Sequence, residues 1–138
     1  MLYEDQVIDA VCDYLRQHGF TISSRCASTK RGDDIVAHGT GTIRDLHIEA
    51  KGETSKRTGS LRHGLPFDGS QVLDHVAKSF YRAAKMATEG RVGGIALPAN
   101  LAHQKRIADI AHAIDSLGIV VFFVAEDRTV STFRPFTP

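Results

Sequence analysis

Two carboxylates and a lysine stand where they could act together on a phosphodiester. Glu49 and Lys51 flank Ala50 at the end of segment 43–51, and Asp34 opens an earlier apolar run. Carboxylate oxygens can hold Mg²⁺, which lowers the pKa of a bound water and offsets negative charge at phosphorus. A nearby ammonium could orient that water, stabilise the developing charge and help to keep the carboxylates ionised. These are the groups that metal-dependent phosphodiester hydrolysis needs.

Strand geometry would bring these side chains together. Side chains alternate between the two faces of an extended segment, so Glu49 and Lys51 project from one face and apolar residues from the other. A short turn at 39–41 would return the chain, so that Asp34 lies near the strand end that carries both. His47 shares their face, and we interpret it as a packed, hydrogen-bonded residue of a central strand.

The rest of the sequence predicts the elements that must position this site. In chain order we expect a helix at 3–18, strands at 20–27, 34–38 and 43–51 in an antiparallel meander, a helix at 70–88, a strand at 92–97, a helix at 101–117, and strands at 119–125 and 129–133. This order implies an α/β fold in which helices flank a mixed sheet. With 138 residues, we expect one domain over 1–138.

Helix boundaries and one buried helix face are also predicted. Asp68 or Ser70 is expected to cap the second helix and Asn100 the third, and Gly118 is expected to end the third. Apolar residues of the second helix should face inward; they are Leu73, Val76, Ala77, Phe80, Ala84 and Ala87.

The segment Gly32-Asp33-Asp34-Ile35-Val36-Ala37, with fourteen residues between Asp34 and Glu49-Ala50-Lys51, resembles the PD-(D/E)xK nuclease motif. The superfamily is similar to restriction endonucleases and archaeal Holliday-junction resolvases. The resemblance extends over most of residues 1–90 and implies a restriction endonuclease-like fold with an αβββαβ core. No proline precedes the aspartate, and two adjacent aspartates are candidates; we choose Asp34 because the apolar run begins directly after it.

The resemblance also implies roles. Asp34 and Glu49 would be ligands of Mg²⁺ or Mn²⁺, with the backbone carbonyl of Ala50 as a third ligand, and Lys51 would be the catalytic lysine. The implied activity is that of an endonuclease on DNA, in which a metal-bound water attacks phosphorus and leaves a 5′-phosphate.

Two further residues are candidate members of the site. Glu4 matches the acidic residue that such nucleases often carry on the first helix, and it lies at the end of that helix's buried stripe. The alternative is a first-turn glutamate favoured by the helix dipole. Gln71 stands in the first turn of the second helix, where a related helix often bears a glutamine.

Basic residues gather after the motif and could meet a polyanion. Residues 51–91 hold eight Lys and Arg against four Asp and Glu, eight minus four, an excess of four. Lys56, Arg57 and Arg62 lie in the segment 52–68, which has no apolar period and is expected to be a mobile loop. Lys78 and Arg82 belong to a polar stripe of the second helix that could track a phosphate backbone. A solvated helix face with an Asp74–Lys78 pair is the alternative.

Other features limit the class of protein. No apolar run approaches the roughly 20 residues of a membrane span, and residues 1–5 lack the order of a signal peptide, so we expect a cytoplasmic protein. Cys12 and Cys26 have no zinc spacing and are expected to be buried, reduced thiols. A homodimer is expected if both strands of DNA are cut. DNA versus RNA stays open, and so does a catalytically inactive module that binds nucleic acid or serves in assembly.

Overall fold

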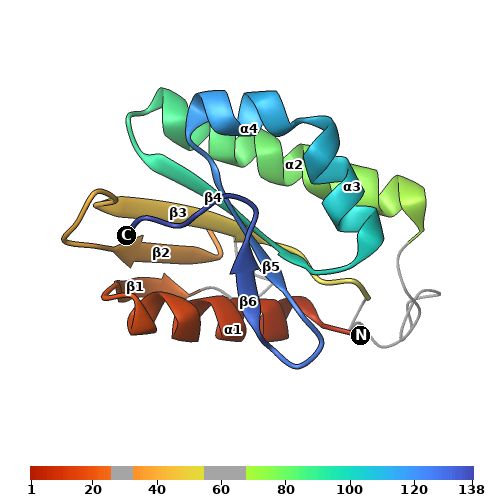
Figure 1. Cartoon of the computed structure of the whole chain (residues 1–138), viewed down its shortest axis with the longest axis horizontal. Helices are drawn as coiled ribbons and strands as arrows, with labels where there is room; N and C mark the ends of the chain where they lie inside the picture. Colours follow the sequence, from red (N-terminus) through yellow and green to blue (C-terminus); the bar gives the residue numbers. More distant parts are fainter. Residues whose placement is uncertain (26–32, 55–67) are drawn as a thin grey trace.

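A six-stranded sheet with helices on both faces organises the chain (Figure 1). The computed structural model describes residues 1–25, 33–54 and 68–138. The elements are α1 (Glu4–Gln17), β1 (Thr21–Arg25), β2 (Ile35–His38), β3 (Asp45–Ala50), α2 (Gly69–Thr88), β4 (Val92–Pro98), α3 (Leu101–Asp109), α4 (Ala111–Leu117), β5 (Val120–Val124) and β6 (Val130–Thr132). The predicted α/β class and αβββαβ order are confirmed.

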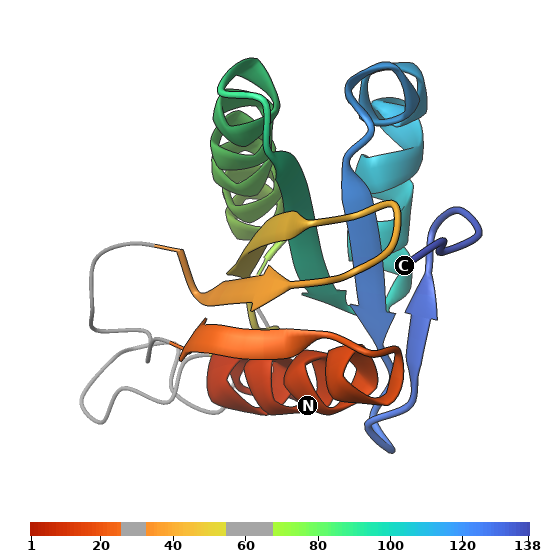
Figure 2. The same cartoon turned by 90° about the vertical axis from the view of Figure 1, so that its left-hand side faces the viewer.

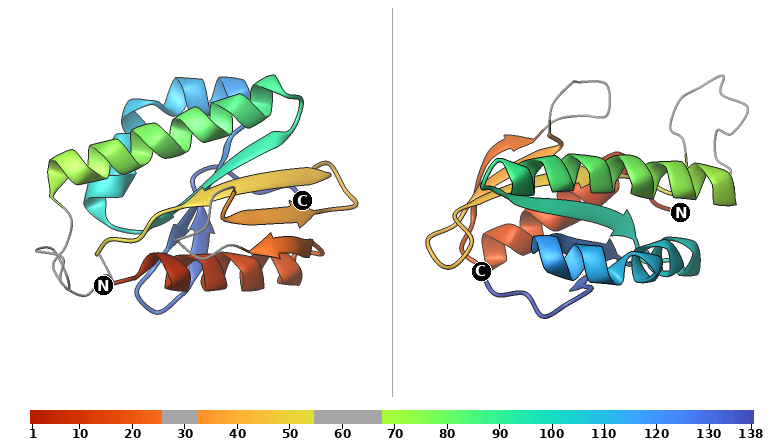
Figure 3. Two further views of the ribbon diagram at one scale, coloured as in Figure 1. Left: turned by 180° about the vertical axis from the view of Figure 1, so that it is seen from behind. Right: turned by 90° about the horizontal axis from the view of Figure 1, so that it is seen from above.

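The strands lie in chain order across the sheet, with mixed directions. β1, β2 and β3 form the predicted antiparallel meander, in which Ile35 pairs with Ile48. β4 runs parallel to β3, and Glu49 lies opposite Ile95. β5 runs parallel to β4, and β6 closes the sheet antiparallel to β5. The crossovers place α2 and the α3–α4 pair on one face, and α1 covers the other (Figures 2 and 3).

Two apolar clusters hold these layers together. The apolar side of β3 is fully buried against α1, as its alternation predicts, through Leu46, Ile48 and Ala50. On the opposite face, side chains of β4 and β5 pack against α2, α3 and α4 in a second cluster. Glu49 and Lys51, which alternate with the first set, therefore project towards the α2 face.

The predicted helix at 101–117 is wrong as one element, because α3 ends at Asp109 and α4 begins at Ala111. Ile110 leaves helical geometry with φ −117° and ψ 22°, and its N–H bonds the carbonyl of Ile107 in a tighter turn. Ile107 and Ile114 are buried on either side of the break. The apolar period thus continues across it, so the pattern resembles one helix.

The predicted inward face of α2 is partly wrong as well. Leu73 is 46% exposed and Ala77 is exposed as well, and the buried residues of α2 are Val72, Val76, Ser79 and Ala83. Small side chains at 79 and 83 let the helix approach the sheet closely, and a search for large apolar residues misses that stripe.

Several smaller expectations are met. Asp68 caps α2 and Asn100 caps α3 through side-chain bonds to backbone N–H groups, and Gly118 ends α4 in the left-handed conformation. Cys12 is buried, whereas Cys26 lies outside the described residues. Over the described ranges, no helix has the length and apolar character needed to cross a membrane.

Candidate active site

Glu49 and Lys51 lie side by side where β3 ends. The Lys51 Nζ is 3.3 Å from Glu49 Oε1, and the two side chains are only 20% and 13% exposed. The Lys51 N–H donates to the carbonyl of Ala96 at 3.0 Å, which extends the pairing with β4 past the end of the strand. The sheet therefore fixes the backbone on both sides of Glu49.

Asp34 reaches the same point from the start of β2. Its carboxylate accepts the N–H of Ala50 at 2.8 Å, and the residue is 5% exposed. The pKa of Asp34 is raised to about 6, mainly by burial and also by the charge of Glu49, although the Ala50 N–H and the charges of Lys51 and Arg82 lower it. The predicted proximity of Asp34, Glu49 and Lys51 is confirmed.

The backbone of Ala50 also faces this group. Its N–H points at Asp34, and the N–H and C=O of one strand residue project to the same side. By this strand geometry, the Ala50 carbonyl points to the Asp34 side of β3.

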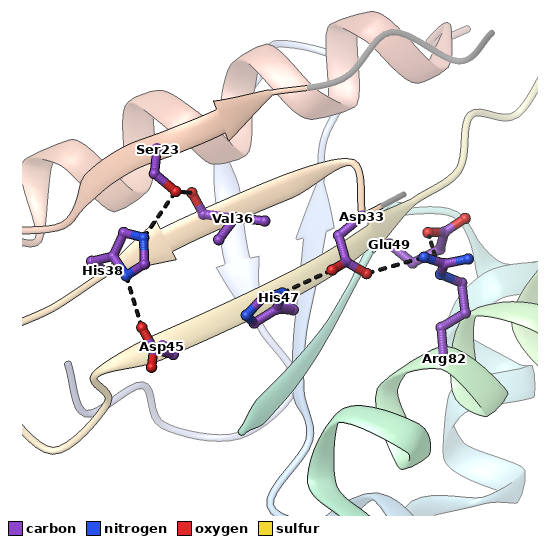
Figure 4. Close-up of polar contacts among 8 residues, drawn as sticks. All are labelled: Ser23, Asp33, Val36, His38, Asp45, His47, Glu49 and Arg82. Atoms are coloured by element: carbon purple, nitrogen blue, oxygen red, sulfur yellow. Dashed lines mark hydrogen bonds and ion pairs between the residues drawn. The ribbon is translucent and has the colours of Figure 1, made fainter. Parts of the chain in front are cut away.

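Asp33, which precedes Asp34, has different hydrogen-bond partners from Asp34. Asp33 Oδ2 accepts from His47 Nδ1 at 2.8 Å, and Asp33 Oδ1 accepts from Arg82 Nη2 at 3.1 Å (Figure 4). His47 is thus the packed, hydrogen-bonded residue that its strand position predicts. Asp34 faces Ala50, whereas Asp33 faces His47 and Arg82, so the two aspartates differ in environment.

Arg82 contacts two carboxylates of the site. The sequence predicts it only as a phosphate contact on the basic stripe of the second helix. From α2 its Nε comes within 3.1 Å of Glu49 Oε2 while Nη2 binds Asp33. Burial disfavours its charge, but the bond to Asp33 and the charges of Glu49 and Asp34 outweigh burial and raise the pKa of Arg82. The available signal was its position beside the small residue Ala83 and about one turn after Ser79, both of which are buried against the sheet.

Glu4 approaches from the first turn of α1. Burial, followed by the charge of Asp34, raises the pKa of Glu4 to about 7, although Lys51 opposes the shift. Gly52, next after Lys51, packs so tightly here that a Cβ would lie 2.5 Å from the Glu4 backbone nitrogen. The start of α1 and the exit of β3 are therefore in direct contact.

The structure describes two of the other predicted residues, Gln71 and Lys78. Gln71 forms a capping box with Asp68, in which each backbone N–H donates to the other's side chain at 2.9 Å. Lys78 is exposed on α2, and no ion pair with Asp74 occurs among the described residues. Three predicted loop contacts lie outside the described residues; they are Lys56, Arg57 and Arg62.

Glu53 holds the chain that follows Lys51 in place, a role that the sequence did not indicate. Its two carboxylate oxygens accept from the Leu2 N–H at 2.8 Å and from Asn100 Nδ2 at 2.9 Å. Asn100 Oδ1 in turn accepts from His103 Nδ1 at 2.8 Å. These bonds tie the exit of β3 to the chain before α1 and to the start of α3.

Acidic groups outnumber basic ones here. The acidic cluster, defined as Glu4, Asp33, Asp34 and Glu49, faces two permanent cations, Lys51 and Arg82. Two mostly buried carboxylates and a backbone carbonyl are oxygen donors of the kind that Mg²⁺ and Mn²⁺ prefer, and the excess negative charge suits a divalent cation. Among residues 1–25, 33–54 and 68–138, no group of three or more His, Cys, Asp or Glu side chains could hold a metal.

A second polar network lies further along the meander. His38 Nδ1 is 2.7 Å from Asp45 Oδ1, and His38 Nε2 is 2.8 Å from Ser23 Oγ (Figure 4). The order is that of a Ser-His-Asp triad, but all three residues are exposed, and Ser23 Oγ also lies 3.3 Å from the Val36 carbonyl. Because water screens the Asp45 charge, we assign the network the role of linking β1, β2 and β3.

No family model and no curated protein matches the sequence. Among solved structures, the chain shows distant similarity to SfsA of Pyrococcus furiosus in complex with Ca²⁺, with 14% sequence identity and a TM-score of 0.37. The match covers 90% of this chain and 58% of SfsA, so the chain spans less than two thirds of that protein. A likeness this distant assigns neither a family nor an activity to the chain.

Proposed function

We propose that the chain is a nuclease that hydrolyses phosphodiester bonds in DNA with Mg²⁺ or Mn²⁺. The observation that carries the proposal is the meeting of Asp34, Glu49 and Lys51 at the end of β3. The resemblance of these residues to the PD-(D/E)xK motif supports it, and so does the αβββαβ order of the elements.

The metal would be held by carboxylate oxygens of Asp34 and Glu49 and by the carbonyl of Ala50. Bound there, it would supply positive charge beside the scissile phosphate and lower the pKa of a water molecule. The burial that raises the pKa of Asp34 keeps water away from the ligands, which strengthens the attraction of its ionised form for a cation.

Lys51 is the group that faces the reacting phosphate in this proposal. Its ammonium lies 3.3 Å from Glu49, so it is already beside a proposed metal ligand and needs no rearrangement to act there. There it donates to the phosphate oxygens on which negative charge grows, or to the attacking water. Glu4, whose pKa is about 7, can accept a proton at this site near neutral pH.

The substrate would be held mainly through its backbone phosphates. Lys78 on α2 and the basic residues Lys56, Arg57 and Arg62 are the proposed contacts. Such contacts neutralise charge without reading bases, so we expect affinity that falls with salt and little sequence preference.

Cleavage of single-stranded, duplex and branched DNA tests the proposal. We expect wild type to cut at least one form with Mg²⁺ or Mn²⁺ and none in EDTA, and Glu49→Ala and Lys51→Ala to lose about 100-fold or more in rate. Asp45→Asn is the matched control, since Asp45 is a carboxylate on the same face of β3 and 52% exposed.

Equal cleavage by wild type, Glu49→Ala and Lys51→Ala would contradict the assignment. DNA binding without cleavage of any form, and without Glu49-dependent Mn²⁺ binding, would instead support a non-catalytic module that binds nucleic acid.

A further inference from the structure

The guanidinium of Arg82 bridges two carboxylates at the edge of the acidic cluster (Figure 4). It lies 3.1 Å from Asp33 Oδ1 through Nη2 and 3.1 Å from Glu49 Oε2 through Nε. The side chain is 39% exposed, whereas both carboxylates are mostly buried. Arg82 therefore offsets part of the negative charge of the cluster, and its side chain remains partly exposed to solvent.

The two contacts of Arg82 differ in kind. The bond to Asp33 has normal hydrogen-bond geometry, and His47 holds the other oxygen of Asp33 in place. Arg82 Nε and Glu49 Oε2 are close, but within the described part of the chain neither atom has a directed hydrogen bond. The contact with Glu49 is therefore mainly electrostatic. Its geometry leaves both atoms able to form better-directed hydrogen bonds with other partners.

Glu49 has no uncontacted oxygen. Lys51 contacts Oε1 and Arg82 contacts Oε2, so a divalent cation at Glu49 meets a positive charge already in place. Like charges at such distances repel, and they repel more strongly in a partly buried site than in water. Binding of a cation would thus weaken the contact between Arg82 and Glu49, while Asp33 keeps the arginine nearby.

We propose that Arg82 is an exchangeable counter-ion and phosphate ligand. Anchored by Asp33, it neutralises Glu49 in the metal-free protein and turns its N–H groups to a substrate phosphate when a divalent cation takes its place at Glu49. The planar fork of a guanidinium suits a phosphate, which offers two acceptors at matching separation. The inference rests on the proposed nuclease function.

This exchange gives Asp33 a positioning role. The residue precedes a proposed ligand, but its oxygens hold His47 and Arg82 and leave metal binding to Asp34. Asp33 then limits how far Arg82 moves, so the guanidinium stays beside the site after it leaves Glu49.

Calorimetric titration with Mn²⁺ alone tests the exchange without any catalytic readout. We expect Arg82→Gln to tighten Mn²⁺ binding about fivefold or more, because a competing charge is removed. Arg82→Lys, which keeps the charge, should tighten it less. Lys105→Gln is the control for loss of one positive charge, since Lys105 is exposed on α3, and it should stay within about twofold of wild type.

Cleavage at saturating Mn²⁺ tests the phosphate contact. We expect Arg82→Gln to cleave DNA at a rate at least about tenfold below wild type, although it binds Mn²⁺ more tightly. Arg82→Lys should also cleave more slowly, because lysine lacks the planar fork of the guanidinium. Circular dichroism of each variant, with Arg82→Lys as the conservative change, separates these effects from loss of folding.

The outcomes distinguish this inference from the function on which it rests. If Glu49→Ala abolishes Mn²⁺ binding but Arg82→Gln binds no tighter than Lys105→Gln, the exchange is overturned and the nuclease proposal stands. If Arg82→Gln binds Mn²⁺ more tightly and cleaves as fast as wild type, the phosphate contact is overturned. Absence of any Glu49-dependent Mn²⁺ binding would overturn the proposed function and the exchange together.

Discussion

The surroundings of the two adjacent aspartates, Asp33 and Asp34, decide which of them can serve as a metal ligand. Asp34 faces Ala50 and Glu49, whereas Asp33 is engaged by His47 and Arg82. We expect Asp34→Asn to weaken Mn²⁺ binding by about 30-fold or more, because an anionic ligand is lost, and Asp33→Asn to change it by only a few-fold. Calorimetry of both variants checks this, and the reverse ranking would assign the ligand to Asp33.

The raised pKa of Glu4 makes stability depend on pH. The folded protein holds this proton up to about pH 7, and the unfolded chain releases it near 4.5, so stability from this residue is present at low pH and lost as pH rises through 7. In EDTA we expect Glu4→Gln to be more stable than wild type at pH 8 by about 1–3 kcal/mol and nearly equal at pH 4.5.

Urea denaturation of Glu4→Gln and wild type at the two pH values measures this difference. Comparison of the two proteins cancels the titration of the groups that do not interact with Glu4. A difference in unfolding free energy that is the same at pH 4.5 and pH 8 would show that Glu4 is not held protonated by its surroundings.

The acidic and basic core of the site could be predicted because it depends on short-range geometry. Strand alternation places Glu49 and Lys51 on one face, and one turn brings Asp34 beside them. The positions of Arg82 and Glu53 depend on how α2 and the start of α3 pack on the sheet. No local pattern sets those rotations, so the contacts of both residues with the site could be found only in the structure.

At the scale of elements, the packing of α2 on β4 holds Arg82 in reach of the site. A Cβ on Gly93 would lie 2.4 Å from the Ala83 carbonyl oxygen, next in sequence to Arg82. We expect Gly93→Ala to destabilise the fold by about 1–3 kcal/mol, because the helix must shift away.

Gly69→Ala is the matched control for that substitution, since nothing lies within 4 Å of its added Cβ. We expect it to be neutral or slightly stabilising, as alanine favours helix more than glycine does. Urea denaturation compares the two, and equal stability of the two variants would show that α2 and β4 do not pack this closely.

Element order was largely predictable, and the errors have a common cause. The meander, the buried β5 and the caps of α2 and α3 follow from alternation, continuous apolar runs and side-chain acceptors. The break at Ile110 and the exposure of Leu73 arise where tertiary packing chooses among several apolar residues. Periodicity alone cannot make that choice.

At the scale of the whole molecule, a net charge of +1 conceals a division between the acidic cluster and the basic residues around α2. In EDTA we expect DNA affinity to fall as salt rises from 50 to 200 mM, and Lys78→Gln to reduce the slope of log K against log salt by about one. Fluorescence anisotropy of a labelled duplex measures both, with Lys105→Gln as control. Affinity that does not change with salt would exclude the phosphate contacts.

The central claim is a divalent cation held by Asp34 and Glu49 as the working centre of a nuclease. Anomalous diffraction from crystals soaked with Mn²⁺ tests it most directly, because manganese is located by its own signal. We expect one strong peak within coordination distance of both carboxylates and the Ala50 carbonyl, and its absence from Glu49→Ala crystals. No peak between Asp34 and Glu49 at saturating Mn²⁺ would contradict the account.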